Sequence, residues 1–408
     1  MASRAAWLVD HVIPAVPVRQ WVLTLPWPRR FLLARRPELA RGVLAAGLGV
    51  IFRWYAECAR SPCDARCGAV TIVQRFGSAL NLNLHFHILI PDGAWVLGTG
   101  SAPAFQSVQG PTTHDVEDLV VRLAEACERF LARRGFGEDD SAEDPDSDDA
   151  QVLLQQASLA GVAALGRRAG RQVRRLQVHG GREYPLPPHC AGCDGYNLHA
   201  GVRVAAHDRA GLERLCRYVS RPPLARARLE EQDDGSLVLL LKTPWADGTT
   251  ALHLSPLELV ERLVALIPPS RKNEVLYHGV FAAHAAWRPR VVPRPPPDAV
   301  PAHAHRRLAR PPAPAPDPYW PAWAALLWRV FQVDPLACPS CGGPLRLRTV
   351  VLPPATADIL AGLHAAAAGG PYPRGPPPAA TTPTPTGFSP AALGLFPAAC
   401  LSSTLSCS

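Results

Sequence analysis

The sequence predicts a mixed α+β fold, in which an antiparallel sheet carries two histidines and a tyrosine-bearing helix packs against that sheet. Residues 81–90 alternate apolar and polar side chains with a period of two, as in a half-buried strand. Residues 208–221 instead repeat apolar side chains at helical spacing. After residue 289 the chain is rich in proline, which predicts an extended linker at 290–317 and a low-complexity, disordered tail at 353–408.

Strand-like and helix-like segments follow one another along the chain in mixed order. Residues 19–25 are predicted to form a short strand, and residues 28–57 are predicted to be largely helical and amphipathic. Two strands are expected between residues 69 and 90, because both segments are strand-like and a turn follows at 91–93. The spacing of residues 114–134 predicts an amphipathic helix. Further strands are expected at 198–204, 237–241 and 250–254.

An acidic segment divides the structured part of the chain. Residues 138–149 include eight acidic side chains and no basic one, so 137–150 is predicted to be a solvated linker or insertion. It separates residues 1–136 from residues 151–289, which we expect to be two parts of one domain. Residues 318–352 form a small segment with a tryptophan-rich helix at 320–331 and a Cys-x-x-Cys pair.

Charge and cysteine usage narrow the class of protein. The formal net charge is +8 even with the acidic segment included, which favours a polyanion as partner. An odd number of cysteines, eleven, in a chain without a secretory signal pattern predicts reduced thiols. No apolar run reaches about 18 residues, so no membrane partner is expected and the predicted location is cytoplasmic.

The histidines of the 81–90 strand are the first candidate site. His85 and His87 leave the strand on the face opposite Leu84 and Phe86, roughly 7 Å apart at the backbone. Two imidazoles at that spacing can close on one divalent metal ion. Two histidines in a strand are, however, more often surface residues or satisfied core residues than metal ligands. If their face of the sheet is covered, a polar pair there needs a reason, which favours the metal site.

A tyrosine on the 208–221 helix is the second candidate. Asp208 is the predicted N-cap, and Pro222-Pro223 ends the helix. Tyr218 projects at the edge of the apolar face, beside three arginines on the polar side of the helix. A tyrosine can attack a phosphodiester when a divalent ion polarises the phosphate and arginines hold the backbone, although such a ring can also simply lie at a core boundary. The three arginines are Arg214, Arg217 and Arg221.

These segments resemble the HUH-type single-strand DNA transposases of rolling-circle bacterial insertion sequences. The resemblance covers about residues 6–350 and rests on six blocks in the same order. These are 16–26, 68–87, 195–200, 215–224, 241–250 and 278–284. It implies that His85 and His87 bind a divalent metal, Mg²⁺ or Mn²⁺, and that Tyr218 is the nucleophile. The implied reaction is cleavage and rejoining of single-stranded DNA at transposon ends through a 5′-phosphotyrosine.

The chain departs from the family pattern in three places. Two-tyrosine members have a second tyrosine where this chain has Arg214, so the resemblance is to a single-tyrosine branch. Family members usually begin with a zinc-binding domain that we expect this chain to lack, and the tail beyond about residue 365 has none of the family's ending. A catalytically inactive DNA-binding remnant and a rolling-circle replication initiator or relaxase therefore stay open as alternatives. A metal-dependent hydrolase with a cupin-like His-x-His pair is more distant, because it would not need Tyr218.

Several further residues are candidates for supporting roles. Two imidazoles leave an open metal shell, and a third ligand could come from His199 or Gln74, with His253 a weaker choice. Arg75 and Lys242 are predicted phosphate contacts together with the arginines of the tyrosine helix. Cys338 and Cys341 resemble half of a zinc knuckle, and Cys190 and Cys193 resemble another half, but neither pair has a clear second pair nearby.

Overall fold

The computed structural model describes residues 1–60, 64–97, 102–137, 149–178 and 187–293, together with 326–327 and 329–330. The described residues up to 293 belong to one compact unit. Its helices are α1 (Ala2–His11), α2 (Trp27–Arg35), α3 (Pro37–Cys58), α4 (Thr113–Ala132), α5 (Ala150–Ala160), α6 (Arg209–Val219), α7 (Pro256–Ala265) and α8 (Arg288–Val291). Short 3-10 turns lie at Gly166–Arg168 and Arg226–Arg228. The fold is mixed α+β with antiparallel sheets, as predicted.

The strands form three sheets. The main sheet has six strands in the order β12-β2-β3-β1-β8-β7, and each neighbouring pair is antiparallel. These strands are β1 (Val18–Thr24), β2 (Gly68–Phe76), β3 (Leu82–Pro91), β7 (Cys190–Cys193), β8 (Tyr196–Val204) and β12 (Val275–Gly279). A four-stranded sheet contains β6 (Arg174–Gln177), β9 (Leu229–Glu231), β10 (Leu237–Leu240) and β11 (Thr249–Leu254). The strands β4 (Gly93–Leu97) and β5 (Pro103–Ser107) form a hairpin.

The main sheet takes strands from both sides of the acidic segment. The central strand β1 pairs with β3, which precedes that segment, and with β8, which follows it. Because backbone hydrogen bonds join the two parts, residues 1–136 and 151–289 cannot form separate domains. Of the segment 137–150 itself, residues 138–148 lie outside the described part of the chain.

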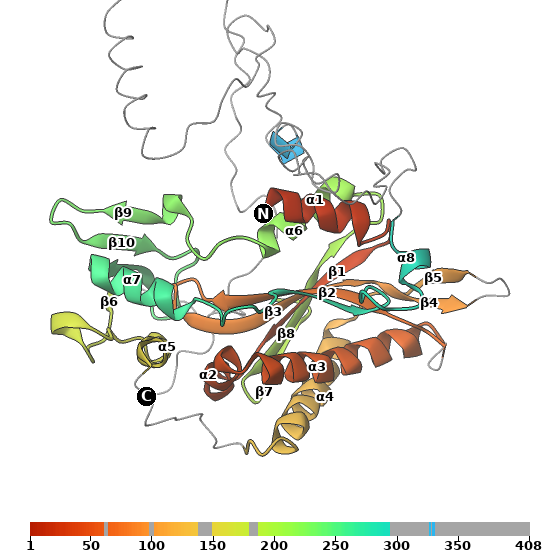
Figure 1. The fold of residues 1–408 in the computed structure, drawn as a ribbon, viewed down its shortest axis with the longest axis horizontal. Coiled ribbons are helices and arrows are strands. Elements are labelled where there is room, and N and C mark those ends of the chain that lie inside the picture. Colours follow the sequence, from red (N-terminus) through yellow and green to blue (C-terminus); the bar gives the residue numbers. More distant parts are fainter. Residues whose placement is uncertain are drawn as a thin grey trace, which may run out of the picture. The chain divides into compact units, whose positions relative to one another are not determined.

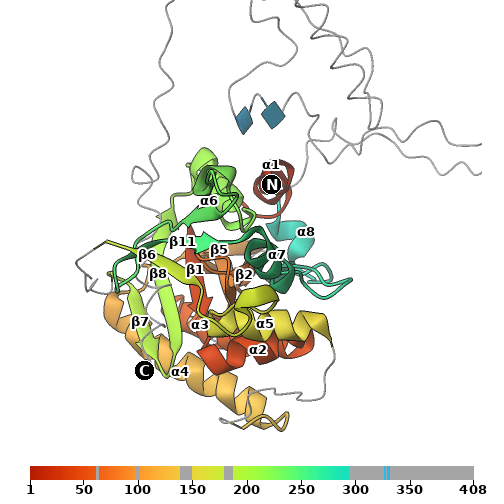
Figure 2. The same ribbon diagram turned by 90° about the vertical axis from the view of Figure 1, so that its left-hand side faces the viewer.

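Helices cover both faces of the main sheet (Figures 1 and 2). The helices α3 and α4 lie on one face, and α1 and α6 lie on the other. The apolar face of β3 packs with the first pair, so Leu84, Phe86 and Ile88 share a core with residues of α3 and α4. Every residue of β3 is buried. The strand that alternates in sequence is therefore covered on its polar face as well, and its histidines lie in the interior.

Residues 28–57 are largely helical, as predicted, and they form two helices. The break lies at Arg36, which leaves the helical conformation with φ −115° and ψ 82°, and Pro37 begins α3. The residue before a proline is sterically disfavoured in the α region, and proline itself suits the first turn of a helix. By length and composition α3 could cross a membrane, although it contains no apolar run of about 18 residues. Here its apolar side chains pack in the core beneath the sheet.

Candidate active site

The two histidines lie side by side on the inner strand β3. His85 is opposite Thr24 of β1 and Gln74 of β2, while His87 is opposite Val22 and Ile72. The ring centroids are 5.0 Å apart, and each histidine is at most 2% exposed. The predicted face and the predicted pairing of the two imidazoles are thus present, on the side of the sheet that α1 and α6 cover.

Each imidazole has a hydrogen-bond partner at Nδ1. His85 Nδ1 lies 2.8 Å from the Asn83 carbonyl oxygen, which can only accept, so Nδ1 carries the proton and Nε2 keeps its lone pair. His87 Nδ1 lies 2.6 Å from the carboxamide of Gln20 on β1. A carboxamide can present its oxygen or its nitrogen to the ring. In metalloproteins, histidines that bind a metal commonly anchor their other ring nitrogen by a hydrogen bond of this kind.

The surroundings hold both imidazoles neutral, which is the form that binds a metal. Burial, together with the positive charges of Arg30 and Arg221, lowers the pKa of His85 to about 4. Burial also lowers the pKa of His87 well below its ordinary value. Asn83, on the same face of β3, has a buried side-chain oxygen without a hydrogen-bond partner among the described residues. Two neutral imidazoles with anchored Nδ1 atoms and a nearby amide oxygen fit a divalent ion.

The candidates for a third ligand lie at different distances from this pair. Gln74 is directly opposite His85 on the neighbouring strand, whereas His199 is two strands away from His87, across Val22. His253 lies in the four-stranded sheet, 3.0 Å from the Ser236 hydroxyl. Within the described ranges no three side chains of the His, Cys, Asp or Glu type gather to hold a metal. An amide oxygen is therefore the protein ligand that the arrangement offers beside the two imidazoles.

The helix α6 places the tyrosine as the sequence predicted. The Asp208 side chain caps the helix by accepting from the Gly211 amide at 2.7 Å. Leu215, Cys216 and Val219 are buried, and Tyr218 in the last turn is half-buried. The helix end is tied to β2, the neighbour of the histidine strand, because Gln74 Nε2 donates to the Val219 carbonyl at 2.6 Å.

Cationic side chains surround the Tyr218 phenol. The Arg221 guanidinium carbon lies 4.6 Å from the centroid of the tyrosine ring. Lys242 Nζ donates to the Tyr218 hydroxyl at 2.9 Å. The charge of Arg221 also lowers the pKa of both His85 and His87, which means that this cation lies within electrostatic reach of both imidazoles. Arg221 therefore links the tyrosine to the histidine pair.

The other predicted phosphate contacts pair with groups of the protein itself. Arg214 is 3.8 Å from Asp208 at the start of α6, and Arg217 is 3.7 Å from Glu213. Arg75 alternates with Gln74 along β2 and so points to the opposite face of the sheet. There it is 6% exposed and donates to the carbonyls of Leu266 and Ala34, so burial keeps it from the surface where DNA would contact the protein.

Two contacts of the site, those of Gln20 and Lys242, are not among the contacts that the sequence predicts. Gln20 lies two residues before Val22 along β1, and Val22 is opposite His87, so a period of two places Gln20 on the face of the histidines. Lys242 was considered as a phosphate contact only, because nothing local in the sequence connects it to a helix more than twenty residues earlier.

The cysteine pairs give no zinc site in the described part of the chain. Cys338 and Cys341 lie outside the described residues, as does most of the predicted helix 320–331. Cys190 and Cys193 are at the two ends of β7, where Cys190 is in a disulfide and Cys193 is a free thiol.

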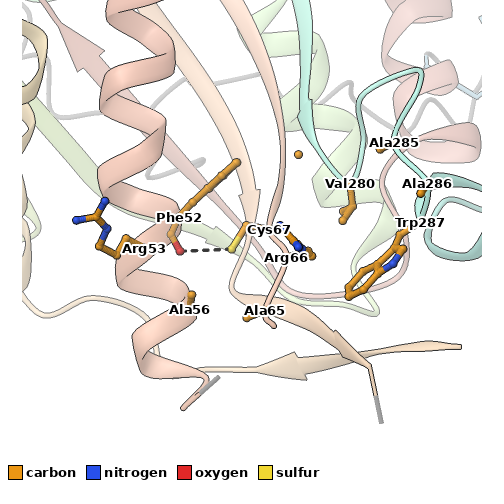
Figure 3. A pocket seen from close by; sticks show the side chains of 11 residues that line it. Phe52, Arg53, Ala56, Ala65, Arg66, Cys67, Val280, Ala285, Ala286 and Trp287 are labelled. Atoms are coloured by element: carbon orange, nitrogen blue, oxygen red, sulfur yellow. Dashed lines mark hydrogen bonds between the residues drawn. The ribbon is translucent and has the colours of Figure 1, made fainter. Parts of the chain in front are cut away.

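A separate pocket lies at the other end of the sheet (Figure 3). It has a volume of about 610 Å³ and is lined mainly by α3, the residues just before β2 and the segment that follows β12. In Figure 3 Trp287 lies on one side of this space and the α3 residue Phe52 on the other, and Cys67 donates to the Phe52 carbonyl at 3.6 Å. Burial raises the pKa of the Cys67 thiol to about 12, so it stays protonated. No histidine lines this pocket, which is distinct from the Tyr218 centre.

A comparison with protein families identifies the chain. The family model described as "Putative transposase" matches residues 68–288, which is more than half of the 408 residues. The chain belongs to this transposase family. The matched range contains both histidines of the transposase, the whole of α6 and Lys242, so the centre described above lies inside the part that defines the family. No curated protein and no solved structure matches the chain.

Proposed function

We propose that this transposase cleaves and rejoins single-stranded DNA by metal-dependent transesterification, as an HUH-type enzyme of the rolling-circle class. Tyr218 is the nucleophile, His85 and His87 hold a Mg²⁺ or Mn²⁺ ion, and the DNA partner is the single strand at the element's ends. The observation that carries the proposal is the position of Arg221, which lies over the Tyr218 ring and within electrostatic reach of both imidazoles. A nucleophile, a cation and a neutral imidazole pair thus converge.

Each residue has a role that follows from its chemistry. The Tyr218 oxygen attacks phosphorus and forms a 5′-phosphotyrosine, while the bond to the 3′-oxygen breaks and that oxygen becomes a hydroxyl. Arg221 can neutralise charge on the phosphate as it develops, and a guanidinium suits phosphate geometry. The bound metal ion would supply further charge stabilisation at the phosphate. Rejoining reverses these bond changes when a 3′-hydroxyl attacks the phosphotyrosine.

The helix α6 leaves open how one tyrosine processes two strands. Arg214 stands in the place of a second tyrosine. It forms an ion pair with Asp208, the N-cap of the helix. A second strand would then be transferred by a free 3′-hydroxyl or by the tyrosine of a second protomer.

The test is a cleavage assay on labelled single-stranded DNA taken from the flanks of the gene, with Mn²⁺ or Mg²⁺ and with EDTA as control. We expect a covalent protein–DNA adduct on a denaturing gel that needs the metal and is lost in Tyr218→Phe. Tyr277→Phe is the matched control, since Tyr277 is another half-buried tyrosine on the edge strand β12. An adduct that persists in Tyr218→Phe would contradict the proposal.

One alternative has an observation in its favour. An inactive DNA-binding remnant is compatible with the lack of a third His, Cys, Asp or Glu ligand in the described part of the chain. It would bind DNA with a steep salt dependence but form no adduct with any metal. Cleavage confined to a replication or transfer origin would instead indicate an initiator or relaxase.

A further inference from the structure

Lysine is rare in this chain, and one of its lysines forms a hydrogen bond with the proposed nucleophile, Tyr218. The sequence contains forty arginines but only two lysines, Lys242 and Lys272. A guanidinium does not lose its proton in proteins, whereas a buried lysine readily does so. From the composition of the chain we would expect an arginine at the Tyr218 hydroxyl. The lysine found there differs from arginine because it can lose its proton.

Lys242 and Tyr218 come from different parts of the fold, and their side chains are in direct contact. Lys242 closely follows β10 of the four-stranded sheet, and Tyr218 lies at the end of α6. The ammonium nitrogen is 2.9 Å from the phenolic oxygen and 4.8 Å from the centroid of the ring. Such a distance allows a proton to pass between the two groups without an intervening water.

The groups that face Lys242 favour its neutral form. Lys242 is exposed at the surface, but partial desolvation together with the positive charges of Arg221 and Arg228 lowers its pKa to about 8. The imidazoles of His85 and His87 are neutral, so they add no charge that acts on Lys242. A base whose pKa lies close to the working pH is the most effective one for proton transfer.

We propose that Lys242 is the catalytic proton-transfer partner of Tyr218, an inference that rests on the proposed function. During cleavage the neutral amine takes the phenolic proton as the Tyr218 oxygen bonds to phosphorus. The bond from phosphorus to the 3′-oxygen breaks, and that oxygen takes a proton from water. During rejoining the 3′-hydroxyl attacks phosphorus and gives up its proton to water, while the Lys242 ammonium returns a proton to the departing Tyr218 oxygen. One residue thus serves both directions, as reversibility requires.

The experiment compares adduct formation by the full chain and its variants on labelled single-stranded DNA in Mn²⁺, between pH 6 and 9.5. We expect the wild-type rate to rise with pH and level off near pH 8. Lys242→Met should lower the rate by about 10²- to 10⁴-fold and abolish this inflection. Lys242→Arg keeps a positive charge but cannot accept the proton, so it should be as slow as Lys242→Met. Lys272→Met removes the other lysine, which is also exposed, and should leave the rate unchanged.

Fluorinated tyrosine at position 218 separates proton transfer from folding. Fluorine lowers the pKa of a phenol, so a fluorinated Tyr218 needs less help from a base and should restore part of the rate in Lys242→Met. A variant that is slow because it is misfolded would not recover in this way. Full activity of Lys242→Arg, or no recovery with the fluorinated residue, would overturn the inference.

The outcomes also distinguish this inference from the proposed function. Metal-dependent adduct formation that is lost in Tyr218→Phe but unaffected in Lys242→Met overturns the role of Lys242 alone. A wild-type protein that forms no adduct with any metal overturns the proposed function and the role of Lys242 with it.

Discussion

Gln74 of β2 donates its side-chain amide to the Val219 carbonyl at 2.6 Å, and this bond ties the sheet to the last turn of the tyrosine helix. Gln74 is also directly opposite His85 on the neighbouring strand. The carbonyls of the last helical turn have no partner within the helix, so a side chain from the sheet can satisfy one of them. The bond therefore helps to fix the position of Tyr218 relative to the two imidazoles.

Replacing Gln74 should loosen this junction. We expect Gln74→Leu to lower the free energy of unfolding by about 1–3 kcal/mol, because the Val219 carbonyl loses its partner in a buried position. The measurement is urea unfolding followed by circular dichroism. Gln155→Leu is a matched control, since that buried glutamine makes a longer bond of 3.5 Å to the Ala265 carbonyl and should cost less. Equal losses in the two variants would show that the Gln74 bond has no special weight.

Gln20 should control the metal affinity of His87. For His87 Nε2 to bind a metal, Nδ1 must carry the proton, so Gln20 must turn its side-chain oxygen toward the ring. We expect Gln20→Leu to weaken Mn²⁺ binding about 10- to 100-fold, as measured by titration calorimetry without DNA. Thr71→Val is the control, because Thr71 is a buried polar residue on the opposite face of β2. Unchanged Mn²⁺ affinity in Gln20→Leu would argue that His87 does not bind through Nε2.

The buried histidines should make the metal-free protein less stable in acid. The unfolded chain binds a proton at His85 near the ordinary pKa of 6.5, while burial lowers that pKa to about 4 in the folded state. Between these values the unfolded state binds more protons, so the free energy of unfolding falls as the pH drops from 6.5 toward 4.

We expect a double variant, His85→Gln with His87→Gln, to show a shallower loss over this range in EDTA. Urea unfolding at a series of pH values measures it. Some slope should remain, because burial also lowers the pKa of His199 and His278 to about 4. An identical slope in wild type and variant would mean that the two imidazoles are accessible to protons when folded.

Asp92 should be a strong determinant of stability far from the chemistry. Its carboxylate is fully buried and accepts from Arg19 at 2.9 Å, from Tyr55 at 2.8 Å and from Arg203 at 3.1 Å. We expect Asp92→Ala to lower the free energy of unfolding by about 3–5 kcal/mol, because it leaves the buried Arg19 charge without its partner. Arg203→Ala, at a half-exposed side chain, should cost at most about 1 kcal/mol. Thermal unfolding of both variants distinguishes the buried from the exposed half of the network.

The local patterns of the sequence carried most of the correct predictions. Alternation in residues 81–90 placed His85 and His87 on one face of a strand, and the spacing in α6 placed Tyr218 at the edge of a buried face. Both follow from the geometry of a single element, in which neighbours along the chain decide the direction of a side chain. The break between α2 and α3 was readable too, since Pro37 disfavours the helical conformation of Arg36.

Contacts between distant elements were decided by the tertiary structure alone. Whether Lys242 meets a phosphate or the Tyr218 hydroxyl depends on how the four-stranded sheet lies against α6, and no periodicity in the sequence encodes that packing. The same holds for Arg75, which is charged and yet buried because its strand face is covered by other elements. The sequence by itself determined which groups could do chemistry, since residue type and local period are written in it. Only the packing of elements far apart in the chain decided which of those groups meet.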